Sequence, residues 1–455
     1  KMRQRFVGYV ALLQVFLLLL SNAVETTDQD LRNAGETTMA MVDYFGGMPV
    51  TTLSNGKTIP LVGLGVGNTQ QYLVPLLVAG GIQEDKKIRL IDTSHISDNE
   101  QLISEGISQG IQRIETKDDE KITVHVVTKV WYTYLGFERT KISVRNSFEK
   151  LEAEIDHDKV DLKVHVLLNW PRCYDHVEWM DCQGEEDNLP EEIRNAGPPP
   201  HLMKKNSWKK SWAALEEMYQ SQELPIESIG VSNFHMKDFA ELEQFATTMP
   251  HILQINLWSL LYDPTLIDYC QQRNIHVMVY SVMSLVMNDP ERAPHALHHL
   301  EKITGDLSLA MKDELTPAQI ILAWLMQHGV SVIPKTTRLS RLQENSALSL
   351  ANVPEMSDKQ VEIVAHAVEA YLSGKDLEAD LNVSIEFKAE TRDLLIFRKL
   401  RDGSEIQIAF LPKGKSFNEN TYPKHDYRVY DADNKEEFVD YKVEAKFGEH
   451  ATVPF

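Results

Sequence analysis

The chain has 455 residues, which is too long for one ordinary domain and predicts two folded units behind a processing segment. Hydrophobic residues make up 43% and charged residues 25%, a composition typical of globular proteins and not of disordered ones. The formal net charge of −21 argues against nucleic acid or an anionic membrane as partner, because both would repel the chain.

The first predicted element is a secretory signal peptide over residues 1–23. Basic residues precede an apolar run from Phe6 to Leu20, and small residues lead up to a cleavage site after Ala23. The run is about 15 residues long, short for a bilayer span of about 20, and an uncleaved anchor stays open as the alternative. Cleavage would leave a polar linker over residues 24–45 on a protein that is secreted or held in the endomembrane lumen, without membrane contact.

Short apolar runs alternate with amphipathic segments over residues 46–372. The runs, read as buried strands, are Leu61–Leu64, Arg89–Asp92, Thr123–Lys129, Leu162–Asn169, Glu227–Val231, Ile252–Leu257, His276–Ser281 and Ser331–Pro334. The amphipathic segments, read as helices, include Asn99–Ile111, Val144–Ile155, Trp212–Tyr219, Lys237–Phe245, Pro264–Arg273 and Pro317–Gln327. This alternation predicts an α/β fold, a (β/α)8 TIM barrel.

A long insertion follows the fourth predicted strand. Residues 172–211 are rich in proline, asparagine and charge, so we expect a lid or specificity loop at the barrel mouth. Cys173 and Cys182 lie within it and would form a disulfide in an oxidising compartment, with two free thiols as the alternative. No metal site is expected there, because the loop does not clearly supply the further ligands that zinc needs. Cys270 reads as a small buried hydrophobe.

The pattern changes after residue 372. A polar linker over 373–380 leads into alternating strands and turn signals, which predict a small all-β sandwich domain over 381–455. The expected strands are Val383–Phe387, Leu394–Phe397, Ile406–Phe410, Tyr427–Tyr430 and Val443–Phe447. Asn382, in an Asn-Val-Ser sequence, is a glycosylation acceptor if the chain is secreted.

Polar residues stand at the carboxyl ends of the predicted barrel strands, where this fold places its chemistry. They are Asp92, Lys129, Asn169, Ser232, Asn233, Gln254, Tyr280, Ser281, Lys335 and Thr336. Such a concentration of hydrogen-bonding side chains predicts a site, with ordinary turn polarity as the alternative.

These positions resemble the aldo-keto reductase family. The motifs are Leu53–Pro60 with Gly63–Gly65, Ile91–Ser94 with Asn99 and Glu100, Thr128–Trp131, Trp170 with Pro171, Ile229–Phe234 and Ile333–Lys335. They occur in the family's order and at its spacing. The resemblance implies NADP(H) as the cofactor and a small carbonyl compound as the substrate.

The cofactor half of the family's site is matched. By resemblance, the residues that would hold NADP(H) are Ser232, Asn233 and Gln254 at the carboxamide, Tyr280 with Ser281 at the nicotinamide ring, Lys335, Thr336 and Arg341 at the 2′-phosphate, and Glu344 and Asn345 at the adenine. Two cations and a hydroxyl suit a dianionic phosphate; solvated surface cations are the alternative reading.

The catalytic half departs from the family's Asp, Tyr, Lys, His tetrad. Asp92 and Lys129 match, but Ser97 occupies the position of the tyrosine and Asn169 that of the histidine. A serine hydroxyl is a poor acid, and an amide donates a hydrogen bond without being a proton source. His95 is a candidate substitute acid, and a structural or solvated histidine is the alternative.

The C-terminal segment resembles the von Hippel–Lindau-type β domain, which reads hydroxyproline in peptides. The resemblance lies in Ile385–Phe387, Asp402 with Gly403, Phe410–Gly414 and Asn420–Tyr422. It places Thr421, His425 and Tyr427 at pocket positions, while Arg398 and Ile408 stand where aromatic residues are expected. A structural or protein-docking β-sandwich is the preferred interpretation.

Three functions follow from these observations. The first is an NADP(H)-dependent oxidoreductase with altered proton delivery, which the cofactor residues favour. The second is a secreted pseudoenzyme whose barrel binds NADP(H) or another ligand and whose β domain docks a protein, including one that contains hydroxyproline; Ser97 and Asn169 favour it. The third, a binding protein with an empty barrel, requires the cofactor set to be accidental.

Overall fold

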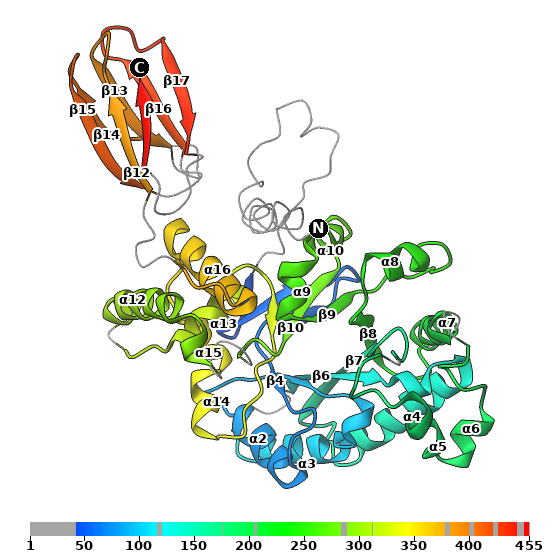
Figure 1. Cartoon of the computed structure of the whole chain (residues 1–455). Helices are drawn as coiled ribbons and strands as arrows, with labels where there is room; N and C mark the ends of the chain where they lie inside the picture. Colours follow the sequence, from blue (N-terminus) through cyan, green and yellow to red (C-terminus); the bar gives the residue numbers. More distant parts are fainter. Residues whose placement is uncertain are drawn as a thin grey trace. The chain divides into compact units, whose positions relative to one another are not determined.

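The structure, a computed structural model, describes residues 42–115, 121–174, 176–203, 207–283, 289–311, 313–377, 383–399, 405–421, 426–443 and 450–454. The expected signal peptide, Asn382 and His425 lie outside these ranges. The described chain forms two units (Figure 1). The described residues of the first unit lie within Asp30–Asn288 and Thr304–Glu355. The described residues of the second unit lie within Asp289–Ile303 and Met356–Phe455.

Eight parallel strands form the main sheet of the first unit. They are β4 (Leu64–Gly65), β5 (Leu90–Asp92), β6 (Ile122–Val130), β7 (Val160–Leu168), β8 (Ile226–Ser232), β9 (Ile252–Asn256), β10 (His276–Tyr280) and β11 (Ser331–Val332), hydrogen-bonded in chain order. Bridges from Val62 to Val332 and from Gly65 to Lys335 join the last strand to the first. The curled sheet therefore closes into a barrel. Seven of the predicted strands overlap their observed counterparts by two or more residues, whereas the first, expected at Leu61–Leu64, lies at Leu64–Gly65.

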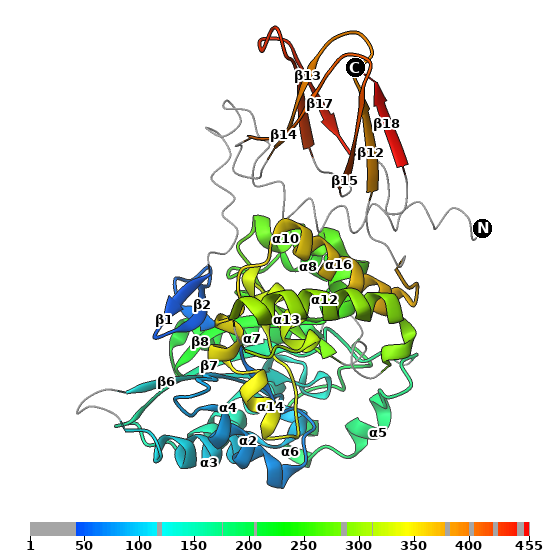
Figure 2. The same ribbon diagram turned by 90° about the vertical axis from the view of Figure 1, so that its left-hand side faces the viewer.

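Helices surround this sheet. They are α2 (Val74–Gly81), α3 (Glu100–Ile111), α4 (Phe137–Glu152), α5 (Cys182–Asp187), α6 (Glu191–Asn195), α7 (Ser207–Ser221), α8 (Met236–Leu242), α9 (Leu257–Tyr262), α10 (Pro264–Gln272), α13 (Pro317–Gln327), α14 (Ser340–Glu344) and α15 (Ala347–Ala351). Figure 2 shows α2, α3 and α4 side by side on the outside of the strands. The six expected helices are present; α4 begins earlier than predicted because its first turn is polar. Within the described ranges, none of the helices has the length and apolar character that a bilayer crossing requires.

Short 3-10 turns follow several strands. They are Gln71–Leu73, η4 (His95–Ser97), η5 (Tyr132–Tyr134) and Pro290–Arg292. The turn η4 directly follows β5, and η5 directly follows β6, so both belong to the loops at the carboxyl ends of barrel strands. They position Ser97 and Tyr134 at the mouth side of the barrel.

The barrel interior is built in layers. An apolar layer contains Leu90, Val127, Leu167, Ile252, Met278 and Ile333, and Leu53 and Ile59 from an antiparallel hairpin pack against it. That hairpin is formed by β2 (Met48–Thr52) and β3 (Thr58–Pro60), which together with β1 (Asp43–Phe45) make a three-stranded antiparallel sheet. Because side chains alternate along a strand, Lys129 shares the inward face of Val127, and Asn169 follows Leu167 in the same way.

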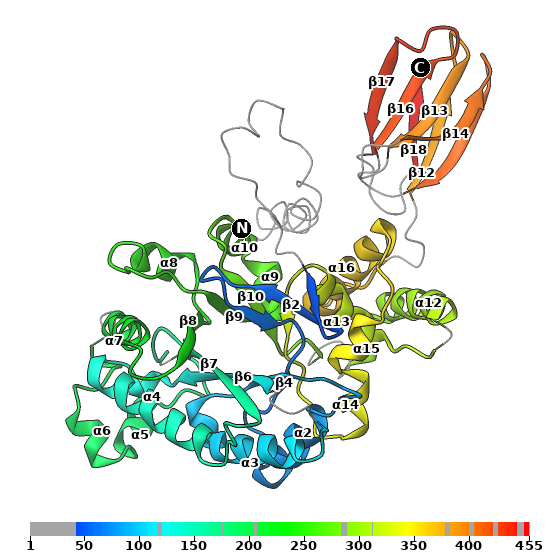
Figure 3. The same cartoon turned by 180° about the vertical axis from the view of Figure 1, so that it is seen from behind.

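The second unit contains a β-rich region of two sheets. One has the order β15 (Ser416–Thr421), β12 (Val383–Lys388), β18 (His450–Pro454), and the other β14 (Glu405–Leu411), β13 (Leu394–Lys399), β16 (Asp426–Asp431), β17 (Phe438–Lys442). Figure 3 shows the second sheet's strands side by side. Buried residues from both sheets, including Phe387, Ile396 and Val429, form one core. The unit also holds α16 (Asp358–Ser373) and the first part of α12 (Pro294–Met311).

Four of the predicted β-region strands match β12, β13, β14 and β16. Three others, β15, β17 and β18, were not expected, because their sequences are polar or lack a clean alternation. The strand expected at Val443–Phe447 is not found at Val443, and its other residues lie outside the described ranges.

Candidate active site

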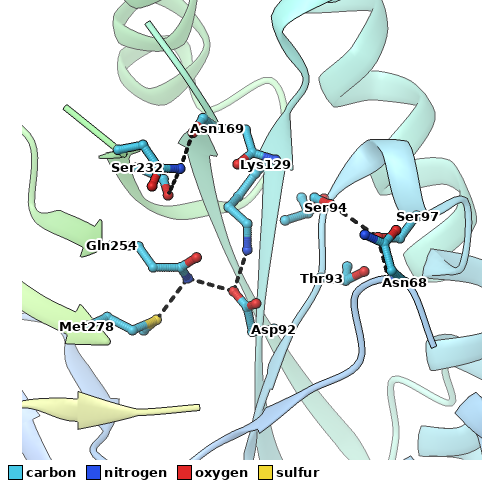
Figure 4. A network of polar contacts seen from close by, with 12 residues as sticks. Asn68, Asp92, Thr93, Ser94, Ser97, Lys129, Asn169, Ser232, Gln254 and Met278 are labelled. Carbon is cyan, nitrogen blue, oxygen red and sulfur yellow. Dashed lines mark hydrogen bonds and ion pairs between the residues drawn. The ribbon is translucent and has the colours of Figure 1, made fainter. Parts of the chain in front are cut away.

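A buried charged cluster occupies the carboxyl end of the barrel (Figure 4). Lys129 Nζ lies 2.6 Å from Asp92 Oδ1, and Gln254 Nε2 donates to the same oxygen at 2.7 Å. Met278 Sδ accepts from Gln254 Nε2 as well. A buried ammonium has three protons to donate, so Lys129 keeps donors for an additional oxygen atom.

Ser97 does not join this cluster. Its Oγ accepts from the backbone N–H of Asn68 at 3.2 Å and lies 3.2 Å from Ser94 Oγ. Figure 4 shows Ser97 turned toward those two residues. The left-handed backbone of Asn68 and Asp98, with φ of 51° and 44°, shapes the two loops that bring these atoms together. The hydroxyl of Ser97, the residue expected at the tyrosine position, therefore serves loop structure.

Asn169 lies beside the residues expected at the nicotinamide. Its backbone carbonyl accepts from Asn233 Nδ2 at 2.9 Å, and Ser232 Oγ accepts from the same amide at 3.1 Å. Tyr280 OH donates to Asn233 Oδ1 at 2.7 Å. Burial raises the pKa of Tyr280 to about 12, against the opposing effect of its amide partners. The structure thus brings β7, β8 and β10 residues together as one hydrogen-bonded group.

His95 stands at the edge of the mouth, in η4. Its ring centroid lies 4.4 Å from that of Tyr134. Burial, reinforced by Lys150 and opposed by Asp98, lowers the pKa of His95 to about 4. The imidazole is therefore neutral at pH 7, a state that is a weak proton donor.

A group of cations lies at the end of β11 and in the segment that follows. Lys335 Nζ donates to the carbonyls of Gly67 and Asn68 at 2.7 and 2.9 Å, and burial lowers its pKa. Arg338 and Arg341 are exposed. Within the described ranges, none of the three cations, Lys335, Arg338 and Arg341, makes an ion pair with a carboxylate.

The remaining residues expected at the phosphate and adenine lie in the same segment. Thr336 is buried, and its Oγ1 accepts from the backbone N–H of Arg338 at 3.0 Å. Glu344 ends α14, and Asn345 follows it as a buried residue. Ser281 follows Tyr280 with a positive φ of 57°.

The insertion after β7 is anchored to the barrel mouth. Cys173 and Cys182 are joined by a disulfide, and Cys270 is free and buried. Arg139 and Glu186 form a buried bidentate ion pair with both distances at 2.8 Å. The ion pair ties the insertion to α4, and the disulfide closes a loop within the insertion.

Thr421 and Tyr427 do not form an open pocket in the β region. Tyr427 is 0% exposed and belongs to the core, and its hydroxyl donates to Thr421 Oγ1. Burial raises the pKa of Tyr427 to about 12. A peptide could reach neither side chain in this arrangement, which corrects the expectation of a pocket there. Tyr427 is buried because its ring packs against Phe387 in the core.

Sequence reasoning missed several residues of the site. Asn68 links Ser97 to Lys335, Met278 bonds Gln254, and Trp179 contacts two other tryptophans. The tryptophans in the Thr128–Trp131 and Trp170 motifs could have been used to predict aromatic side chains at the barrel mouth. No group of His, Cys, Asp or Glu in the described part of the chain is arranged to hold a metal ion.

Comparison with known proteins places this geometry in a family. The profile of the Aldo/keto reductase family matches residues 85–369. A 9,11-endoperoxide prostaglandin H2 reductase of Trypanosoma cruzi is 29% identical over 299 residues, covering 65% of this chain and 83% of its own. The uncharacterized oxidoreductase YtbE of Bacillus subtilis is 30% identical over 302 residues, covering 65% and 86%.

Solved structures show the same fold. The Bombyx mori aldo-keto reductase AKR2E4 in complex with NADP has a TM-score of 0.52 at 23% identity, covering 70% of this chain and 92% of its own. The aldo-keto reductase AKR2E5 complexed with NADPH has a TM-score of 0.50 at 25% identity, covering 72% and 88%. With the family's profile matched over most of the barrel and its fold reproduced, the chain belongs to the aldo/keto reductase family.

Proposed function

We propose that the barrel is an NADP(H)-dependent oxidoreductase in which proton delivery differs from the family's usual scheme. The observation that carries this proposal is the Asp92–Lys129–Gln254 cluster, which is assembled at the end of the barrel that hosts chemistry in this fold. A buried ion pair contributes little net stability compared with apolar packing, so its presence at this end favours a functional role.

The polar atoms left free at the site suit a carboxamide. Both donor contacts of Gln254 are made through Nε2, which leaves its Oε1 as an acceptor without a donor among the described residues. Ser232 Oγ accepts from Asn233 and keeps its own proton to donate. One acceptor and one donor side by side match the NH2 and C=O of a nicotinamide carboxamide.

The cations after β11 suit the 2′-phosphate. Lys335, Arg338 and Arg341 lie in one short segment of an otherwise acidic protein, and carboxylates of the described chain neutralise none of them. A dianionic phosphate gains charge-assisted hydrogen bonds from such a group. The solved relatives with NADP and NADPH bound support the same cofactor here.

NADP(H), when bound, supplies or accepts the hydride. The chain's own residues position the substrate oxygen: Lys129 has donors to spare, and the side-chain amide of Asn169 donates to no described residue. Neither group replaces a phenol as general acid, and the absence of one typically costs about 10²–10⁴-fold in rate. We therefore propose a tetrad that is degenerate at Ser97 and Asn169, with slow or altered carbonyl reduction.

A second candidate function is a pseudoenzyme that binds NADP(H) and docks a protein through the β region. The observation in its favour is that the hydroxyl of Ser97 is committed to Asn68 and Ser94. An enzyme that still needed this group would leave it free to face the substrate.

Titration of intrinsic NADPH fluorescence with the purified protein tests the cofactor proposal. We expect tighter binding of NADPH than of NADH, and Lys335→Met should remove that preference. Lys210→Met, an exposed lysine on α7, is the matched control and should leave both affinities unchanged. Equal wild-type affinity for the two cofactors contradicts the assignment.

We also propose that the chain enters the secretory pathway. The sequence pattern of residues 1–23 and the Cys173–Cys182 disulfide support this, because disulfides persist in oxidising compartments. Mass spectrometry of the native protein should find that residues 1–23 have been removed and that Asn382 carries a glycan. Residues 2–23 still present on the native chain would overturn the cleavage.

A further inference from the structure

Three side chains at the carboxyl end of the barrel are poorly suited to protonate a substrate. The hydroxyl of Ser97 is bonded to two neighbouring loop residues, and the imidazole of His95 is neutral at pH 7 because burial lowers its pKa to about 4. The amide of Asn169 is not a proton source. Reduction of a carbonyl gives an alkoxide, which must take up a proton. These three positions therefore fit carbonyl reduction poorly.

The ammonium of Lys129 also carries acidic protons, but it is held in place by its partner. Its Nζ lies 2.6 Å from Asp92 Oδ1, and both side chains are largely buried. Loss of a proton from Lys129 would leave the carboxylate of Asp92 in a buried position without a counter-charge, which is costly. We therefore expect Lys129 to keep its proton while a substrate reacts.

The same ion pair leaves an anionic oxygen open to a ligand. Asp92 Oδ1 accepts from Lys129 and from Gln254, and no residue of the described ranges donates to Asp92 Oδ2 (Figure 4). The side chain of Asp92 is 11% exposed, so it is not sealed off from the barrel mouth. Burial and, to a smaller extent, the charge of Asp92 raise the pKa of Tyr280 to about 12. A positive group that approaches Oδ2 therefore meets a carboxylate whose charge acts on its surroundings.

Further carboxylates lie beside the barrel mouth. Glu185 accepts hydrogen bonds from Trp131 Nε1 and Tyr132 OH, which are neutral donors, and no cation of the described chain pairs with it. Burial, the hydrogen bond to Glu185, and the charges of Glu185 and Asp181 raise the pKa of Tyr132 well above its ordinary value. Residues 172–203 carry eight acidic and two basic side chains, which gives 2 − 8 = −6. Such a mouth attracts cations and repels anions.

A cationic electrophile fits these observations better than a carbonyl compound does. In an iminium ion, the carbon of the C=N+ bond takes up a hydride, and the π electrons of that bond become the lone pair of the nitrogen. The product is a neutral amine, with NADPH oxidised to NADP+, and no proton passes from the protein to the substrate. The reaction therefore balances without the phenol that is missing at Ser97.

We propose that the barrel reduces iminium ions, and that Asp92 Oδ2 contacts their cationic nitrogen. The substrate class includes protonated imines, whose N–H donates a charge-assisted hydrogen bond to Oδ2, and quaternary iminium ions, which are held by charge alone. Asp92 thus has two separate contacts, with Lys129 at Oδ1 and with the substrate at Oδ2. The hydride donor rests on the proposed function, whereas the binding of a cation at Asp92 does not.

Isothermal titration calorimetry with N,N-dimethylpyrrolidinium, a cation that cannot accept a hydride, tests the binding site without turnover. We expect the wild type to bind it both with and without NADPH. Lys129→Met should tighten binding about tenfold, because the carboxylate of Asp92 then has no counter-charge other than the ligand. Asp92→Asn/Lys129→Met should remove this gain. Glu355→Gln, at an exposed carboxylate outside the site, is the control and should leave the affinity unchanged.

Steady-state kinetics with NADPH test the reaction itself in the wild type. They compare 1-methyl-1-pyrrolinium with cyclopentanone, which has the same ring size and a C=O bond in place of C=N+, after subtraction of the rates without protein. The kcat/KM value should be at least about 10²-fold higher for the iminium ion, because only the ketone needs the missing acid. Ser97→Tyr/Asn169→His should narrow this ratio, because it raises the rate of the ketone alone.

The outcomes separate this proposal from the proposed function. A wild type that binds NADPH but reduces cyclopentanone at least as well as 1-methyl-1-pyrrolinium overturns iminium reduction. Equal affinity for N,N-dimethylpyrrolidinium in the wild type, in Lys129→Met and in the double variant overturns the contact at Asp92. Failure of the wild type to bind NADPH overturns the proposed function, and the titration without cofactor then still shows whether Asp92 binds the cation.

Discussion

The two ends of the barrel interior are both polar and buried, yet they differ in what their side chains can still do. The same inward strand faces supply both ends: β6 carries Lys129 and His125, β8 Ser232 and Ser228, and β10 Tyr280 and His276, while β7 carries His165 and is followed directly by Asn169. The apolar layer around Val127 and Leu167 separates them. Burial of polar groups is therefore common to both ends and cannot by itself mark the active one.

At the amino-terminal end, the polar groups bond to one another and carry no charged pair. His125 Nδ1 lies 3.0 Å from His165 Nε2, and His165 Nδ1 lies 2.7 Å from Ser228 Oγ. His276 Nε2 lies 2.7 Å from Ser331 Oγ. Burial lowers the pKa of all three histidines, for His125 and His276 to about 4. This end is neutral and internally bonded.

At the carboxyl end, by contrast, a charged pair coexists with donors and acceptors that have no partner in the described chain. Lys129, Asn169 and Gln254 each keep such capacity. The comparison teaches that a buried charged pair, and not polarity alone, distinguishes the candidate site from the neutral histidine layer. Four predictions test this difference.

The largest effect is expected from introducing, at the carboxyl end, the tyrosine and histidine that the proposed tetrad lacks. Ser97→Tyr with Asn169→His should raise the rate of aldehyde reduction by about 10²–10⁴-fold, because Asp92 and Lys129 are already in place for a phenol. Steady-state kinetics with NADPH and a small aldehyde measure it. His165→Gln, a change at the other end, is the control and should not raise the rate. No gain in a folded double variant that binds NADPH would contradict the proposed tetrad positions.

The barrel and its strand ends could be predicted from sequence because the apolar runs are short, regular and followed by helical periods. The use of Ser97 could not, since it depends on the left-handed conformations of Asn68 and Asp98. The histidines of the amino-terminal end were read as members of apolar strands, and their mutual bonds depend on register between strands, as between His165 and Ser228. The burial of Tyr427 likewise depends on long-range packing with Phe387.

The second prediction breaks the charged pair. Asp92→Asn should destabilise the protein by about 3–5 kcal/mol, because it leaves the buried ammonium of Lys129 without its counter-charge. Chemical denaturation measures the free energy of unfolding. The double variant Asp92→Asn/Lys129→Met should recover part of the loss, since it removes the uncompensated charge. A double variant less stable than the single one would show that packing, and not charge, explains the loss.

The third prediction concerns pH and the amino-terminal end. Because the pKa of His276 is lowered to about 4, the folded state binds fewer protons than the unfolded state between that value and the ordinary 6.5. The contribution of His276 to the free energy of unfolding is therefore fully present above pH 6.5. This contribution, roughly 3 kcal/mol, is lost as the pH falls through about 4. Denaturation at pH 7.5 and pH 4 should show a smaller acid loss in His276→Gln than in the wild type. His157→Gln, at an exposed position, should leave the acid loss unchanged; an equal effect of both substitutions would refute the role of the buried layer.

The smallest effect is expected at His95, the histidine that stands at the carboxyl end. Its pKa is lowered to about 4 as at the opposite end, mainly by burial, so only about one molecule in a thousand carries the proton at pH 7. We therefore predict that it is a structural group in contact with Tyr134 and does not act as the substitute acid. His95→Ala should cost about 1 kcal/mol of stability through the lost ring contact and change the reduction rate by no more than about twofold. A pH–rate profile of the wild type should show no step near 6.5. A rate that follows a pKa near 6.5 and vanishes in His95→Ala would mean that NADP(H) or substrate binding restores the proton to this imidazole, and it would move the site's general acid from the absent phenol to His95.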